Sequence, residues 1–433
     1  MTDRDRLVDL DRLHLWHPYT QMSSYGRIDP LVIAAAEGSW IEDANGRRYL
    51  DGNSQWWVAT LGHGHPRLKA ALHAQIDRLS HVSLAGVVHE NAAALASELA
   101  AVAPSGLTRV FFSDDGSTAV EVALKMAVHY FHQNGAPKRT RFVVLDGGFH
   151  GETIGAASLG AVDEFRAPYE SILFPVRRTP DPDEIGWSAA FDWIRALLER
   201  EGDTIAAVVV EPVLQGAAGM RMYAPELLTR LREWTRAAGT LLVCDEVFTG
   251  YGRTGAMWAC DLANVAPDLL CTAKGFTGGV LPMAATLATD AIFEGFLGEK
   301  SRAFFHGHSF GGNPLGAAVA REVLAVMRDE DVIGQVRAKA PIVRAAFEQI
   351  GRISGVKSVR TIGLVGAADL GTGGYLGGAG WRVYEAGLRR GAYLRPIGDT
   401  VYVAPALTIS EGDLRSLCRI LAESVEEASA RGA

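Results

Sequence analysis

Lys274 stands in a setting that suits covalent chemistry. It ends the strand-like run 268–273 and is followed by Gly275, Phe276 and further glycines. An apolar setting lowers the pKa of an amine, and a neutral amine is a nucleophile that can form a Schiff base with a carbonyl. The alternative is a lysine whose aliphatic stem lies along apolar surface at a strand end.

Asp245 occupies a comparable place at the end of the apolar run 241–244. Ligands of open α/β sheets bind at the carboxyl ends of the strands. A carboxylate there can pair with a pyridinium nitrogen and keep it protonated, so that the ring withdraws electrons. It can equally cap the next helix or pair with an arginine such as Arg253.

The segment 114–118 joins a strand-like run to a helical pattern. A helix N-terminus has free N–H groups and a positive dipole end, so Gly116, Ser117 and Thr118 are candidates for a phosphate site. Taken alone, the segment is better explained as an N-cap.

Together, a phosphate site, a strand-end acid and an apolar lysine in this order indicate pyridoxal 5′-phosphate (PLP), with Lys274 as its Schiff-base lysine. Phe149 fits an aromatic ring that stacks on the cofactor, and its glycine-rich neighbours argue against plain core.

Alternation of elements predicts the fold that positions these residues. Apolar strand-like runs at 109–112, 141–145, 206–210 and 241–244 are separated by helix-length segments. This pattern predicts an α/β fold with a mainly parallel sheet covered on both faces. We place the large domain at residues 57–328.

The two flanks predict a smaller α+β domain built from residues 1–56 and 329–433. A hairpin signal, Asn45-Gly46, lies in the first flank, and strand-like and helical runs alternate in the second. The glycine-rich segment 371–380 is expected to be a flexible surface loop.

Composition narrows the class of protein. The chain has 433 residues and a formal net charge of -8, which argues against binding to nucleic acid. We find no membrane-length apolar run and no apolar signal-peptide core, and the four cysteines form no CxxC pair. We therefore expect a cytoplasmic protein with no metal site, no disulfide framework and no membrane partner.

Nearly the whole chain resembles the class III, fold-type I PLP-dependent aminotransferases. The matching motifs are residues 211–216, 245–255 and 274–275. The resemblance implies that Lys274 carries the cofactor, Asp245 pairs with its ring nitrogen, and Gly116 and Ser117 bind its phosphate. It also implies a homodimer with shared active sites, in which His308 and Ser309 reach the phosphate of the neighbouring subunit's cofactor.

A second group of motifs resembles the 7,8-diaminopelargonate synthases of biotin biosynthesis. These motifs are residues 14–20, Trp56-Trp57, residues 393–396 and residues 401–402. In that family, 8-amino-7-oxononanoate receives the amino group. By this resemblance Arg395 binds the acceptor carboxylate, and Tyr19, which also counts as catalytic, lines the substrate site. The remaining substrate-site residues implied are Trp56, Phe149, Lys274, Gly307 and Tyr402; Trp56 and Tyr402 could instead be ordinary core or strand residues.

Some residues depart from that family's pattern. Phe149 stands where Tyr is frequent, Glu152 where Asp is frequent, and His308 where Pro is common. The resemblance implies S-adenosylmethionine as the amino donor, because most synthases similar to this chain use it, and the aromatic residues suit an adenosyl group and a sulfonium. Lysine as donor to the same acceptor, another class III ω-aminotransferase, and a non-catalytic nucleotide-binding module are the alternatives.

Overall fold

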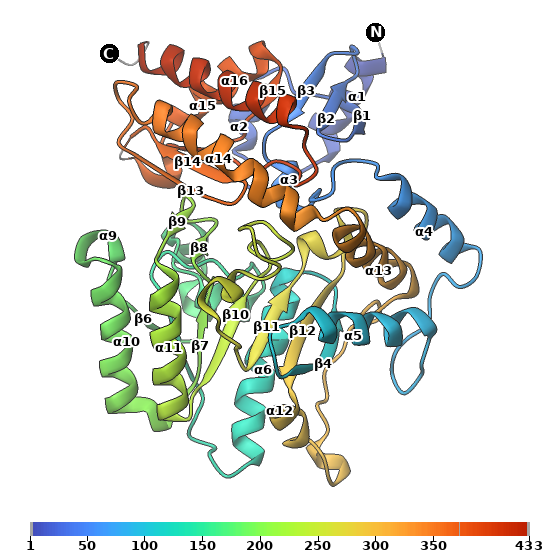
Figure 1. The fold of residues 1–433 in the computed structure, drawn as a ribbon, viewed down its shortest axis with the longest axis vertical. Helices are drawn as coiled ribbons and strands as arrows, with labels where there is room; N and C mark the ends of the chain where they lie inside the picture. Colours follow the sequence, from blue (N-terminus) through green and yellow to red (C-terminus); the bar gives the residue numbers. More distant parts are fainter. Residues whose placement is uncertain (1–2, 372, 431–433) are drawn as a thin grey trace.

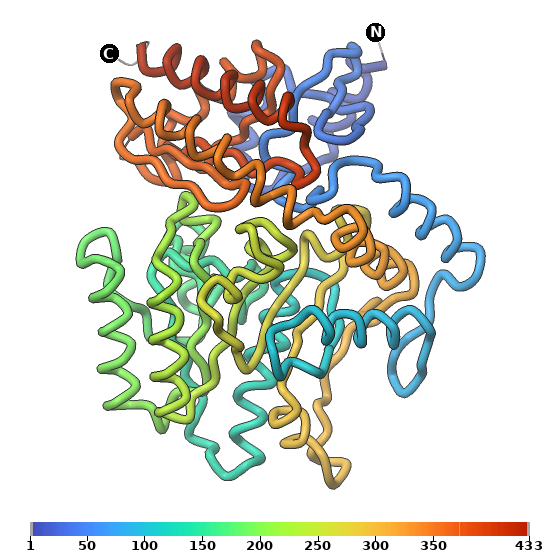
Figure 2. The backbone as a smooth tube through the Cα atoms, viewed as in Figure 1, coloured from blue at the N-terminus to red at the C-terminus, as the bar shows by residue number. Residues whose placement is uncertain are grey.

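The computed structural model describes residues 3–371 and 373–430. Figure 1 shows a large body built around one sheet and a smaller body above it. The backbone tube makes plain that the first segments of the chain, in blue, and the last, in red, lie together in that smaller body (Figure 2).

A seven-stranded sheet forms the centre of the large body. Its strands, in spatial order, are β4 (Leu107–Ser113), β12 (Ala284–Thr289), β11 (Leu269–Thr272), β10 (Leu241–Asp245), β7 (Ile205–Val210), β5 (Arg141–Val144) and β6 (Arg177–Arg178). β12 runs antiparallel to both of its neighbours, and the other pairs are parallel. The predicted mainly parallel sheet is confirmed.

Both faces of this sheet are covered. Along β7, Val208 and Val210 belong to one apolar cluster, whereas Ala207 and Val209 belong to another, because successive side chains of a strand point to opposite faces. Helices α10 (Trp187–Glu201) and α11 (Pro225–Ala238) contribute to the first cluster, and α6 (Gly116–Gln133) to the second. Figure 1 shows α10 and α11 beside the sheet, with α6 in a separate layer. The fully buried strands explain the unbroken apolar runs in the sequence.

The smaller body joins the two ends of the chain. β1 (Ile33–Glu37), β2 (Trp40–Asp43) and β3 (Arg48–Asp51) form an antiparallel sheet, and β2 and β3 turn about Asn45-Gly46 as predicted. β15 (Ala392–Tyr393) adds parallel to β3. A second sheet contains β13 (Ser358–Ile362), β14 (Val365–Asp369) and β16 (Thr400–Val403). The β3–β15 pairing supports a domain built from both termini, and its division at residues 56 and 328 stays a prediction.

Helices complete both bodies. In the smaller body α14 (Val332–Ile350), α15 (Ala379–Arg390) and α16 (Glu411–Ala430) pack on the sheets. α4 (Pro66–Ile76), α5 (Glu90–Val102) and α13 (Pro314–Asp329) pack together on the large body. The chain begins with α1 (Asp3–His14) and α2 (Met22–Tyr25).

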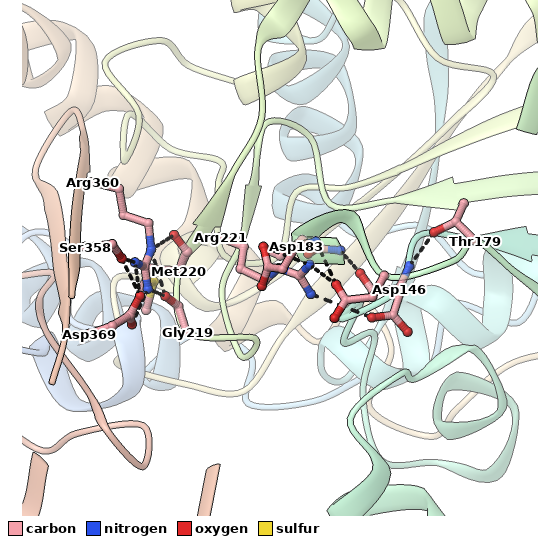
Figure 3. Close-up of polar contacts among 11 residues, drawn as sticks. Asp146, Thr179, Asp183, Gly219, Met220, Arg221, Ser358, Arg360 and Asp369 are labelled. Atoms are coloured by element: carbon pink, nitrogen blue, oxygen red, sulfur yellow. Dashed lines mark hydrogen bonds and ion pairs between the residues drawn. The ribbon is translucent and has the colours of Figure 1, made fainter. Parts of the chain in front are cut away.

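Arg360 of β13 ties the smaller body to the larger one. Its guanidinium donates to the carbonyl oxygens of Gly219 and Met220, with an Nε–O distance of 2.8 Å for Met220. It also donates to Asp369 on the neighbouring strand β14. Figure 3 shows this fan of bonds at one end and, beside it, Arg221 among acidic side chains of the large body. Because the guanidinium presents its donors in a fixed geometry, it binds both bodies at once.

Three further features bear on the class of protein. Within the described ranges, no helix has the length and apolarity needed to cross a membrane. Over the same ranges, no cluster of His, Cys, Asp and Glu is placed to hold a metal ion. All four cysteines are buried free thiols.

Candidate active site

The chemistry-bearing residues meet in one cavity of about 450 Å³ at the carboxyl ends of the strands. Lys274 follows β11, Asp245 ends β10, and Gly116 and Ser117 begin α6 after β4. These residues and Phe149 line this cavity. Parallel strands end at the same edge of a sheet, which explains why residues far apart in the sequence converge.

Lys274 presents its amine to this cavity. Nζ lies 4.6 Å from the centroid of the Trp57 ring. Burial lowers the pKa of Lys274 to about 8, although the carboxylates of Asp245 and Glu211 oppose the effect. About a tenth of the amine is therefore neutral at pH 7, far more than for an ordinary lysine, and a Schiff-base lysine reacts in this neutral form.

Asp245 is buried and held by two donors. Nδ1 of His150 donates to Oδ2 at 2.8 Å, and the Val247 amide donates to Oδ1 at 3.1 Å. Arg253 does not pair with it, because that guanidinium donates to the carbonyl oxygen of Pro405 at 2.6 Å. Burial by itself would lower the pKa of His150, but the bond to Asp245 and the negative charges of Asp245 and Glu211 together outweigh it, and the pKa is raised. Sequence reasoning missed His150, although it directly follows Phe149.

At the start of α6, some residues cap the helix and another is free to bind a ligand. Asp115 accepts from the Thr118 amide at 2.9 Å, and Thr118 Oγ1 accepts from the Asp115 amide at 2.9 Å, so Thr118 serves the cap. Ser117 Oγ accepts from the Glu152 amide at 3.1 Å, which leaves its hydroxyl hydrogen free for an anion. A Cβ at Gly116 would lie 2.7 Å from a methyl group of Val247, so packing against Val247 explains this glycine.

Glu211 holds the backbone of the loop that contains Phe149. The Phe149 amide donates to Oε1 at 3.0 Å, and the Gly216 amide donates to Oε2 at 2.8 Å. Burial raises the pKa of Glu211 to about 7, against the lowering effect of His150. In the same loop, Asp146 Oδ2 lies 3.7 Å from Arg221 Nη1 (Figure 3).

A strained turn places the two tryptophans. In α3 (Ser54–Trp57) the φ angles of Ser54, Gln55, Trp56 and Trp57 are 42°, 46°, 59° and 72°, which is left-handed backbone at four non-glycine residues. Each such residue costs about 1–2 kcal/mol. Ser54 Oγ donates to the Ala404 carbonyl oxygen at 2.7 Å and holds the turn in place. Such strain is characteristic of functional sites, and Lys274 (φ 49°) shares it.

Tyr19, Trp56 and Arg395 lie together outside the cavity lining. The Tyr19 and Trp56 rings are 5.5 Å apart, and the Arg395 guanidinium lies 5.0 Å from the Trp56 ring centroid. The Tyr19 hydroxyl donates to Glu152 Oε1 at 2.7 Å. Tyr402 is 2% exposed and accepts from Trp57 Nε1 at 3.1 Å, so it supports Trp57 from the interior. Its contact with substrate stays a prediction.

Gly307, His308 and Ser309 lie elsewhere. They follow the short helix η5 (Lys300–Arg302) and do not line the cavity of their own chain. His308 Nδ1 lies 2.8 Å from Asp114 Oδ2, and a Cβ at Gly307 would meet open space. Their predicted service to a neighbouring subunit stays a prediction.

These residues fit PLP by their donor set. One cavity contains an amine of lowered pKa, a buried carboxylate with a fixed orientation, free donors at a helix N-terminus and an aromatic ring. These are the groups that would bond to an aldehyde, a ring nitrogen, a phosphate and a flat ring.

Comparison with known proteins agrees with this geometry. The family model for class III aminotransferases matches residues 22–425. An adenosylmethionine-8-amino-7-oxononanoate aminotransferase from Synechococcus elongatus is 42% identical over 425 residues, covering 96% of this chain and 99% of that protein. The Geobacter sulfurreducens protein of the same name is 36% identical, with 98% of each chain covered.

Solved structures give the same result. The enzyme of that name from Methanocaldococcus jannaschii superposes with a TM-score of 0.95 at 34% identity, covering 98% of this chain and 99% of that one. An amine transaminase from an uncultivated Pseudomonas species, solved with PLP bound, gives 0.88 at 33% identity, with 97% and 99% covered. The chain therefore belongs to the class III aminotransferases, which are PLP-dependent enzymes.

Proposed function

We propose that this aminotransferase transfers an amino group from S-adenosylmethionine to 8-amino-7-oxononanoate and forms 7,8-diaminononanoate, a step of biotin biosynthesis. The names of the Synechococcus, Geobacter and Methanocaldococcus relatives support the acceptor and the donor. The acceptor has its ketone near one end, its carboxylate at the other and methylene groups between them. Its site therefore needs a reactive amine, an apolar path and a distal cation.

A row of aromatic rings is the observation that carries the proposal. It starts at Phe149 in the cavity and continues through Phe165, which lies on the short helix α8 (Asp163–Arg166) at a ring distance of 5.8 Å. Phe165 lies 5.2 Å from Tyr19, and Tyr19 lies 5.5 Å from Trp56. Arg395 lies over Trp56 at the far end. An aliphatic chain lying along these rings would bring its carboxylate to Arg395 while its ketone stays near Lys274.

The residues around the cavity supply distinct actions. Bound PLP supplies an aldehyde that takes up the amino group and a ring that withdraws electrons from the reacting carbon. Lys274 would hold the cofactor and, as a neutral amine, take and return the proton at that carbon. The Asp245 carboxylate would hold a proton on the ring nitrogen. Gly116 and Ser117 would bind the phosphate, and Phe149 would cover one face of the ring.

The donor assignment depends on the charges near the aromatic row. Tyr19 and Trp56 are exposed and provide the flat surface that an adenosyl group and a sulfonium favour. Glu152, which accepts from Tyr19, offers a carboxylate to a cationic group of either substrate. Asp399 is buried and its two oxygens accept from the amides of Gly373 and Ala379, so we assign it to the support of this loop and not to the distal acid of a lysine donor.

The two half-reactions test the proposal separately. The yellow PLP enzyme is mixed with S-adenosylmethionine or with lysine, and its absorbance is followed. We expect S-adenosylmethionine to produce the pyridoxamine form, and subsequent addition of 8-amino-7-oxononanoate to restore the original spectrum and yield the diamine by mass spectrometry. If only lysine produces the pyridoxamine form, the donor is lysine and the proposed acceptor stands. If the acceptor restores the spectrum after neither donor, the acceptor assignment is wrong.

We also infer a homodimer whose active sites are shared. Phe305 and Phe310 are 70% and 62% exposed and flank Gly307, His308 and Ser309. Large exposed apolar side chains beside residues that reach no site of their own favour burial against a second copy. In that arrangement Gly307 contacts substrate, and His308 and Ser309 contact the phosphate of the neighbouring subunit's cofactor.

A further inference from the structure

The glycine-rich segment between β14 and α15 is tied down by Asp399. Oδ2 accepts from the Gly373 amide at 2.8 Å, and Oδ1 accepts from the Ala379 amide at 2.9 Å. The Asp399 amide in turn donates to the Gly374 carbonyl oxygen at 3.1 Å. A Cβ at Gly377 would lie only 2.1 Å from the Asp399 carboxylate, so the backbone wraps closely around it. This segment was expected to be a flexible surface loop, and these bonds show instead that much of it is anchored.

Anchoring directs one aromatic residue of the segment toward the row of rings. Tyr375, on the short helix η6 (Gly374–Leu376), meets Phe165 edge to face, with ring centroids 4.7 Å apart and an interplanar angle of 83°. Phe165 contacts Phe149 and Tyr19 as well. Tyr375 therefore packs against the ring that links the cavity to the outer part of the row.

Ring contacts connect Tyr375 to the proposed carboxylate site: beyond Phe165, the rings of Tyr19 and Trp56 follow at 5.2 and 5.5 Å, and the Arg395 guanidinium lies 5.0 Å from the Trp56 ring centroid. Burial raises the pKa of Tyr375, Arg395 opposes the rise, and Glu152 and Glu164 add to it. Arg395 is thus the charged group with the largest effect on this phenol. Within the described part of the chain, no protein group forms a hydrogen bond with the Tyr375 hydroxyl, and the Tyr375 ring contacts Phe165.

We propose that Tyr375 is a specificity-determining residue whose ring, positioned by Asp399 and Phe165, forms the outer wall of the path from the cavity to Arg395. This inference rests on the proposed acceptor. The ring excludes water from the aliphatic part of the acceptor and favours substrates long enough to reach Arg395. Asp399 acts through Tyr375 and is a positioning residue.

Steady-state kinetics with the PLP enzyme and the two half-reactions test this role. Tyr375→Ala should raise the acceptor KM about tenfold, from the apolar contact area lost. It should leave kcat and the donor half-reaction within about threefold of the wild type. Tyr375→Phe keeps the ring and should retain the wild-type KM. Leu376→Ala, at a neighbouring side chain that is 78% exposed, is the matched control and should change nothing.

A double-mutant cycle tests the positioning by Asp399. Asp399→Ala should raise the acceptor KM in the same direction, and adding it to Tyr375→Ala should have little further effect, because both changes remove the same wall. Melting curves should show each variant folded at the assay temperature.

Each other outcome overturns the inference. A wild-type KM in Tyr375→Ala, equal losses in both half-reactions, or a Tyr375→Phe variant as impaired as Tyr375→Ala would do so. Effects of Asp399→Ala and Tyr375→Ala that simply add would remove Asp399 from the proposal. Lack of acceptor turnover by the wild-type enzyme would instead overturn the proposed function, and this inference with it.

Discussion

His150 Nδ1 lies 2.8 Å from Asp245 Oδ2, and the two side chains are 1% and 5% exposed. A hydrogen bond to a charged group in such a buried place is strong and directional. It fixes the plane of the carboxylate and leaves it facing the cavity that Lys274 lines from the next strand. Asp245, the proposed partner of the cofactor's ring nitrogen, is therefore oriented by His150, which lies in the loop after β5 and not at the end of a strand.

Removing the His150 imidazole should weaken the ability of Asp245 to keep the cofactor's ring nitrogen protonated. We expect His150→Ala to slow the donor half-reaction about 10- to 100-fold, since a hydrogen bond to a charged group contributes about 1.5–3 kcal/mol. The pH titration of the bound cofactor's absorbance should shift as well. His89→Ala is the control, because His89 is buried but bonds to the Gly312 carbonyl oxygen away from the cavity. An unchanged titration in His150→Ala would contradict the orienting role.

Borohydride reduction should attach the cofactor to Lys274, and peptide mapping identifies the labelled residue. Lys274→Ala should still bind PLP and lose turnover by several orders of magnitude. Lys339 is a matched control: burial lowers its pKa too, but its amine donates to the Leu407 and Ile409 carbonyl oxygens outside the cavity. Label on Lys339 or any other lysine would make the assignment wrong.

Cofactor capture by the apoenzyme should depend on pH with a midpoint near 8. The pKa of Lys274 is lowered to about 8, so its neutral fraction rises about tenfold per pH unit below 8 and levels off above it. An unperturbed lysine would continue to gain reactivity up to about pH 10. Glu211 raises this pKa, so Glu211→Gln should move the midpoint to lower pH. The rate of PLP binding across a pH series measures the midpoint in the wild type and in Glu211→Gln. A wild-type rate that continues to rise beyond pH 9 would contradict the lowered pKa of Lys274.

Arg395 should affect one half-reaction only. Arg395→Ala is expected to raise the acceptor KM about 30-fold or more, because a charge-assisted bond to carboxylate contributes about 2 kcal/mol. Arg395→Lys should recover part of this affinity but not the bidentate geometry. The donor half-reaction, followed by absorbance, should stay near the wild-type rate. Equal damage to both half-reactions would indicate that Arg395 serves the donor or the fold.

Shared active sites can be tested by mixing two inactive variants. Lys274→Ala and Ser309→Glu are each expected to be inactive, the second because a carboxylate repels phosphate. In a mixed dimer one of the two sites contains neither change, so dissociation and reassociation should restore about a quarter of wild-type activity. Light scattering should show a dimer, with an interface above about 2,000 Å² in total. No restoration, or a fully active monomer, would refute the shared site.

The sequence alone determined the sheet, the cofactor lysine and the strand-end acid as candidates. Each is a local pattern: an apolar run long enough for a buried strand, followed by a polar residue where such strands end. Such patterns involve residues within a few positions of one another, so they can be recognised without knowledge of the packing. The resemblance to a family then supplied the chemistry that the local pattern left open for Asp245 and Gly116.

Packing of whole elements brings the distant groups of the site together. His150 and Asp245 are 95 residues apart in the sequence, and nothing local to either indicates the bond between them. Arg253, a possible partner for Asp245, bonds to Pro405 instead, and Tyr375 contacts Phe165 from a segment that Asp399 anchors. These contacts follow from how whole strands and helices pack, and the packing energy that holds the left-handed turn at Trp56 outweighs the local preference of its residues.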